Sequence, residues 1–156
     1  MSMEIAKMLV ENELTIAKLY GVCAVHFPEI GGFWRDLVQE EIKHAETIKE
    51  LLPEVDGKAL KFNSKRFNIR PLEISMEHAE DVINRIEFGD VNLIGCLSLA
   101  YDIEQSVIES KYYEIFEGRS REFSDRLKSV RNESRGHAIK IREMKQKVLA
   151  GENNAV

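Results

Sequence analysis

Four glutamates and two histidines lie on or beside apolar stripes of the sequence, which have the three- and four-residue spacing of a helix face. They are Glu13, Glu41, His44, Glu104, Glu133 and His137. Burying a charged side chain without a partner is costly, so inward carboxylates and imidazoles on four separate segments need a shared explanation. A common binding site for cations would supply it.

Carboxylates and neutral imidazoles suit divalent iron or manganese, whose charge offsets that of the buried carboxylates. Glu41 and His44 are three positions apart and therefore lie on one face of a helix. With this spacing Glu41 could bridge two metal ions while His44 binds one of them. The pattern favours a site for a pair of metal ions.

Long helices must position these residues, because apolar periodicity and Pro or Gly stops divide the chain into helical segments. We expect four long helices and one short helix, at residues 3–26, 30–52, 75–88, 90–117 and 120–150. Ser75 and Ser120 are suitable N-caps. The polar segment 53–74 is predicted to be a crossover, and residues 151–156 a polar tail. The expected fold is all-α, a four-helix bundle of two antiparallel hairpins, without a β-sheet.

The candidate ligands are predicted to lie at one height in this bundle. Glu13 lies about 15 residues before the first turn, and Glu41 and His44 lie about 12 to 15 residues after it. In the second hairpin, Glu104 lies about 15 residues before the turn, and Glu133 and His137 lie about 14 to 18 after it. Two matching half-sites should therefore meet near the middle of the bundle.

With these features the sequence resembles the ferritin-like carboxylate-bridged di-iron proteins, and among them the diiron domain of rubrerythrins, over residues 5–144. The resemblance is carried by Glu13 with Leu19-Tyr20, by Phe33-Trp34, by Glu40-Glu41-Ile42-Lys43-His44-Ala45, by Glu104 with Tyr112-Tyr113, and by Glu133-Ser134-Arg135-Gly136-His137.

The resemblance implies a single ferritin-like domain over residues 1–156 and an oxidoreductase with two iron ions as cofactor. Hydrogen peroxide or dioxygen would be the oxidant, so the activity would be peroxide scavenging or oxidation of ferrous iron. One iron would be held by Glu13, Glu41 and His44, and the other by Glu104, His137 and Glu133. The same ligands would also suit manganese or a mixed-metal pair.

Two positions depart from the family pattern. Ser134 stands where the family has a Glu three residues before the His, and Val107 stands where rubrerythrins tend to carry a second Glu. Glu133 could reach a metal ion from the opposite flank of its helix. The chain also has no rubredoxin domain with its C-x-x-C pairs, so a separate electron-donor protein is expected. The alternative is a non-catalytic metal-binding, storage or structural bundle with a degenerate second half-site.

Simpler interpretations of single residues stay open. Glu41 and His44 could form an internal salt bridge, Glu13 and Glu104 could be solvated, and His137 could be a hydrogen-bonded core histidine. Glu40 lies about 100° from the stripe and is expected to face water. Tyr20 or Tyr112 could hydrogen-bond a ligand carboxylate.

Composition limits the remaining partners. The 156 residues include 22 Lys and Arg and 27 Asp and Glu, for a net charge of −5. This acidity argues against nucleic acid or an anionic membrane as partner. Cys23 and Cys96 form no C-x-x-C pair, and acidic residues interrupt the N-terminal segment, so we expect a cytoplasmic protein without a signal peptide. Apolar outer faces of helical hairpins favour a homodimer.

Overall fold

The computed structural model describes residues 2–56, 61–62, 70–109, 116–117 and 121–151. Its α-helices are α1 (Ser2–His26), α2 (Gly31–Asp56), α3 (Arg70–Phe88), α4 (Leu93–Glu109) and α5 (Arg121–Leu149). A short 3-10 helix, Pro28–Ile30, lies between α1 and α2. The prediction of a helical bundle is confirmed.

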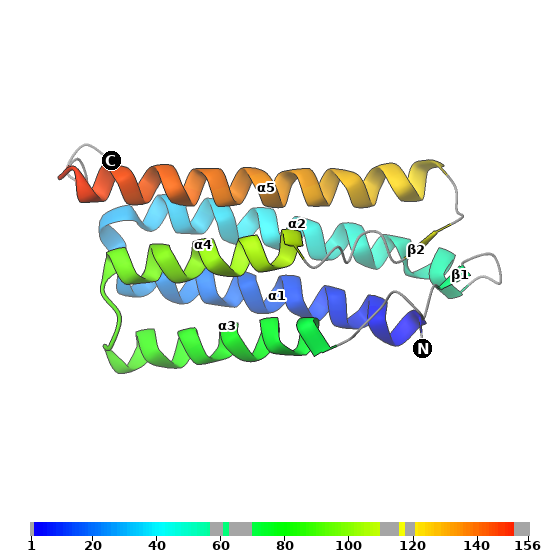
Figure 1. Cartoon of the computed structure of the whole chain (residues 1–156), viewed down its shortest axis with the longest axis horizontal. Coiled ribbons are helices and arrows are strands. Elements are labelled where there is room, and N and C mark those ends of the chain that lie inside the picture. The colour runs from blue at the N-terminus through cyan, green and yellow to red at the C-terminus, as the bar shows by residue number, and fades with distance from the viewer. Residues whose placement is uncertain (1, 57–60, 63–69, 110–115, 118–120, 152–156) are drawn as a thin grey trace.

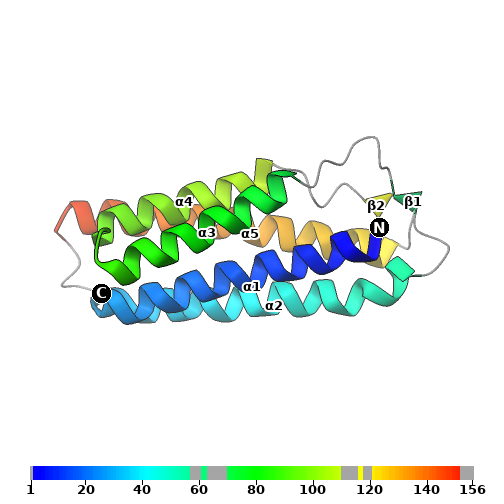
Figure 2. The ribbon, with the colours of Figure 1, turned by 90° about the horizontal axis from the view of Figure 1, so that it is seen from below.

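The helices lie side by side with their axes roughly aligned (Figure 1). Helices α1 and α2 form an antiparallel hairpin through the Pro28–Ile30 turn, and α4 packs antiparallel to α5. Helix α3 packs against α1 and runs back along the bundle before α4 begins (Figure 2). As a result α2 and α4 point in the same direction. The return along the bundle is made by α3, which lies mostly after the crossover predicted at residues 53–74.

Some helix boundaries differ from the prediction. Helix α2 continues through Pro53 to Asp56, and α3 begins at Arg70 rather than Ser75. Proline removes one helical hydrogen bond, but only the last turn of α2 is affected, so the helix ends three residues later. Ser75 is not an N-cap: its buried hydroxyl donates to Oδ1 of Asn12 at 3.1 Å and joins α3 to α1.

The ends of α3 and α4 follow local capping rules. Helix α3 ends before Gly89, whose φ of 89° lies in the left-handed region that glycine adopts readily. Helix α4 begins at Leu93 rather than residue 90, because the Asn92 side chain accepts a hydrogen bond from the backbone N–H of Gly95 at 2.7 Å. The predicted helix 90–117 therefore starts later than expected.

Two expectations are wrong at residues 61–62 and 116–117. The sequence predicted no β-sheet, and it predicted a helix that extends to residue 117. Strands β1 (Lys61–Phe62) and β2 (Phe116–Glu117) pair antiparallel, with Lys61 opposite Glu117. The backbone N–H and C=O groups of an extended segment need hydrogen-bond partners, and each of these two strands supplies partners for the other. Residues 110–115, including Tyr112, lie outside the described residues.

The core lies between the helices and is formed mainly by apolar side chains. Its largest fully buried side chains include Trp34, Tyr20 and Phe123. At mid-length it also encloses a group of polar side chains: Glu13, Glu41, His44, Glu104, Ser134 and His137. Among the described residues, no helix combines the length and the apolar character that a membrane span requires.

Candidate metal centre

Five of the six predicted site residues are buried together, although they come from four helices. The exposed fraction is 2% or less for each of Glu13 in α1, Glu41 and His44 in α2, Glu104 in α4, and His137 in α5. The prediction that these side chains face the core is confirmed, and the interpretation of Glu13 and Glu104 as solvated charges is wrong.

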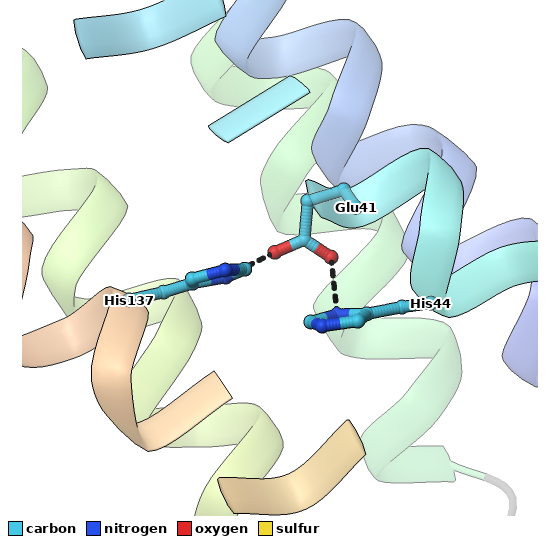
Figure 3. Close-up of side chains that lie close together, drawn as sticks. All are labelled: Glu41, His44 and His137. Carbon is cyan, nitrogen blue, oxygen red and sulfur yellow. Dashed lines mark hydrogen bonds and ion pairs between the residues drawn. The ribbon is translucent and has the colours of Figure 1, made fainter. Parts of the chain in front are cut away.

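Glu41 lies between the two histidines at the centre of the group (Figure 3). Its Oε1 lies 2.8 Å from Nδ1 of His137, and its Oε2 lies 3.3 Å from Nδ1 of His44. The two imidazole rings stack with their centroids 5.1 Å apart and an interplanar angle of 18°. One carboxylate from the first hairpin therefore connects both half-sites.

Each histidine also faces an acidic residue of its own hairpin. Nδ1 of His44 lies 3.8 Å from Oε2 of Glu13, and Nδ1 of His137 lies 3.5 Å from Oε1 of Glu104. The Tyr20 hydroxyl donates to Oε1 of Glu104 at 2.5 Å. This contact confirms that Tyr20 can hydrogen-bond a candidate ligand carboxylate.

The outer ring nitrogens contact carboxylates of the opposite hairpin. Nε2 of His44 donates to Oε2 of Glu133 at 2.7 Å, and Nε2 of His137 lies 2.7 Å from Oε2 of Glu40. The Glu133 and Glu40 side chains are 56% and 38% exposed. Lys140 also contacts Glu40, at 3.0 Å. Each imidazole is thus held between inner and outer carboxylates.

The two hairpins contribute nearly equivalent residues. Glu40 precedes His44 by four positions, as Glu133 precedes His137. Glu41 precedes His44 by three, and the corresponding position before His137 is Ser134, which is 1% exposed. Glu133 therefore corresponds to Glu40 and not to the bridging position. The asymmetry of the centre lies at Ser134.

The structure places Glu133 and Glu40 beside the outer nitrogens of the two histidines. Glu133 contacts the outer nitrogen of His44 from an exposed position, and its role as a ligand stays a prediction. Glu40, predicted to face water, is part of the site through His137. The shared four-residue spacing to each histidine was the available signal. The Val107 side chain lies outside the described residues.

Electrostatics within the cluster favour bound protons. Burial raises the pKa of Glu41 well above its usual range, and the charges of Glu104 and Glu13 raise it further. Burial disfavours a charged His44, but the neighbouring carboxylates of Glu13 and Glu41 outweigh it and raise its pKa to about 10. The pKa of His137 is also raised, because Glu104 and Glu40 outweigh burial.

Two buried polar atoms at the centre lack hydrogen bonds. Oε2 of Glu41 and Nδ1 of His44 have no hydrogen-bond partner among the residues that the structure describes, although they lie 3.3 Å apart. Ligand atoms of Glu41, His44 and His137 all lie within 4.8 Å of one another. Buried polar atoms are nearly always satisfied, so these atoms fit a role as ligands of a cation.

A cleft of about 240 Å³ opens over the site between α2 and α5. Its lining consists of Glu40, Lys43, Glu133, Gly136, His137 and Lys140. His137 belongs both to the lining of this cleft and to the buried cluster.

Comparison of the chain with models of protein families, with curated proteins and with solved structures finds no match.

Proposed function

We propose that the buried cluster binds two divalent metal ions, with iron as the working metal, and that the protein is a di-iron oxidoreductase. The observation that carries the proposal is the pair of unsatisfied atoms, Oε2 of Glu41 and Nδ1 of His44, in a buried centre with three carboxylates. Without metal, bound protons offset the charge of these carboxylates. Metal ions would satisfy both atoms and balance the carboxylate charge.

The ligands divide between two half-sites. Glu13 and His44 would hold one ion, Glu104 and His137 the other, and Glu41, placed between both Nδ1 atoms, would bridge them. Metal-binding histidines usually donate their second N–H to a carboxylate, which fixes the ring orientation. The contacts of Glu133 and Glu40 with the outer nitrogens match that role. We assign both as orienting residues rather than ligands.

Bound iron would supply reversible electron transfer to a small oxidant, hydrogen peroxide or dioxygen, or would be oxidised from the ferrous state. The protein residues would set the conditions for that chemistry. Tyr20 holds Glu104 in place through its hydroxyl, and the surrounding core excludes bulk water. The cleft of about 240 Å³ favours small polar molecules. The helix directions, with α2 and α4 parallel, agree with a ferritin-like bundle.

Ser134 supports a second candidate, a bundle that binds a single metal ion without redox turnover. Its hydroxyl stands where the other hairpin carries the bridging Glu41, so the half-site of Glu104 and His137 has one carboxylate fewer. Loss of a carboxylate ligand weakens the affinity for a hard divalent ion. Metal stoichiometry separates the two candidates, since the oxidoreductase needs two ions in each chain.

The experiment that tests the function is oxidation of ferrous iron by added peroxide. We expect the protein to oxidise iron faster than the uncatalysed reaction, and the substitution His44→Ala to remove the acceleration. The matched control is His26→Ala, because His26 is exposed at the end of α1 and far in sequence from the cluster. Rates in the unmodified protein equal to the background would contradict the proposal.

A further inference from the structure

The two cysteines lie against each other in the core, although 73 positions separate them in the sequence. Sγ of Cys23 in α1 lies 2.9 Å from Sγ of Cys96 in α4, and the exposed fractions of the two residues are 0% and 1%. Both are free thiols. They are the only cysteines of the chain, and the structure brings both to one place.

The separation of the sulfurs is close to that needed for a covalent bond. A disulfide has an S–S distance of about 2.05 Å, so the two sulfurs would have to approach by less than about 1 Å. Because Cys23 and Cys96 belong to different hairpins, a bond between them would connect α1 to α4 across the bundle.

The thiols lie on the same two helices as the contact between Tyr20 and Glu104. Cys23 follows Tyr20 by three positions in α1, which is a rise of about 4.5 Å, and Cys96 precedes Glu104 by eight positions in α4. The Tyr20 ring is buried and its hydroxyl reaches Glu104 at 2.5 Å. An aromatic side chain therefore lies along α1 between the thiol pair and the proposed metal centre.

Direct attack by a solvent oxidant on these thiols is disfavoured. Thiolates react with peroxide far more readily than thiols do. The hydrogen bond with Cys96 and burial raise the pKa of Cys23, so its thiol stays protonated at neutral pH. An oxidant would have to reach the two thiols through the protein interior. The metal centre is the nearest site where we place an oxidant.

We infer that Cys23 and Cys96 form an internal two-electron donor for the metal centre, a role that rests on the proposed function. Oxidation breaks two S–H bonds and forms one S–S bond, which releases two protons and two electrons. One molecule of hydrogen peroxide accepts the two protons and the two electrons, so its O–O bond breaks and two water molecules form. The disulfide must then be reduced by an external dithiol before the next cycle.

The test follows the thiols rather than the activity. The reduced protein is loaded with ferrous iron without oxygen, treated with one equivalent of hydrogen peroxide per chain, and denatured. Free thiols are then counted, and the intact mass is measured. We expect loss of both thiols and of two hydrogens from the mass in the iron-loaded protein, with both thiols retained in metal-free protein treated identically. In Cys96→Ser, which keeps the size of the side chain, the Cys23 thiol should remain free.

Two results would overturn the inference and leave the proposed function intact. One is oxidation of the bound iron while both thiols stay reduced. The other is equal loss of thiols in the metal-free protein, which would show that the pair reacts without the centre. If the protein binds no iron, the proposed function fails, and the inference fails with it.

Discussion

Oε2 of Glu40 in α2 lies 2.7 Å from Nε2 of His137 in α5. The same contact recurs between Glu133 in α5 and His44 in α2, also at 2.7 Å. Each hairpin therefore supplies the carboxylate that orients the other hairpin's histidine. Both rings are held with Nδ1 directed at the buried carboxylates, which is the orientation that a shared metal site requires.

This exchange predicts that Glu40 and Glu133 control metal affinity without being ligands. Removal of a carboxylate that orients a metal-bound histidine typically costs about 10- to 100-fold in affinity. We expect Glu40→Gln and Glu133→Gln each to weaken metal binding within that range while the number of bound ions stays the same, as measured by competition with a chelator.

The matched control for these variants is Glu46→Gln, because Glu46 is exposed on α2, the same helix as Glu40. It removes the same charge from the protein without changing a histidine contact, so the affinity should not change. Equal weakening by all three substitutions would show that net charge, and not orientation, determines the affinity.

The asymmetry at Ser134 gives a second prediction. Ser134→Glu would place a carboxylate where the half-site of Glu104 and His137 lacks one. We expect the second metal ion to bind about tenfold tighter or more, equivalent to about 1.4 kcal/mol. Since a fourth buried carboxylate is costly without a cation, the metal-free variant should unfold at a lower temperature than the unmodified protein.

Ser134→Gln is the control for this variant, because it introduces the same volume without a charge. Its metal affinity should not rise. If both substitutions destabilise the protein equally and neither changes metal binding, position 134 does not face the second ion.

The sequence predicted the inward side chains more reliably than their partners. Helical spacing was sufficient to place Glu13, Glu41, His44, Glu104 and His137 on buried faces, because burial along a helix follows its period. The helical bundle followed from the same pattern. The rotation of neighbouring helices about their axes is not encoded in the spacing of either helix alone.

Glu40 shows why that rotation matters. It lies off the stripe of α2, yet α5 approaches on that flank and brings His137 within 2.7 Å. The contact between Cys23 and Cys96 has the same origin, since only the packing of α1 beside α4 brings the sulfurs together. The β1–β2 pairing also depends on where two distant connections meet.

A third prediction concerns pH. The pKa of His44 is raised to about 10 in the absence of metal, so the ring carries a proton at neutral pH. Metal binding needs the free Nδ1 lone pair and must release this proton. The apparent affinity should therefore rise with pH, by about tenfold per pH unit for each proton released.

Calorimetric titration with a divalent metal, in buffers of different ionisation enthalpy, measures the released protons directly. We expect a binding heat that depends on the buffer between about pH 6 and pH 8. An affinity that is constant over this range, with the same heat in every buffer, would place metal binding at groups other than His44.

The most direct measurement is the number of metal ions bound by each chain. Protein dialysed without oxygen against ferrous iron, then freed of unbound metal, is analysed for iron beside the Glu41→Gln variant. Because glutamine has nearly the shape of glutamate but carries no carboxylate, the substitution should preserve the fold and remove the bridging ligand. We predict two iron ions per chain in the unmodified protein and a loss of at least one in the variant. Equal iron content in the two proteins, or none in either, would contradict a metal centre built around Glu41.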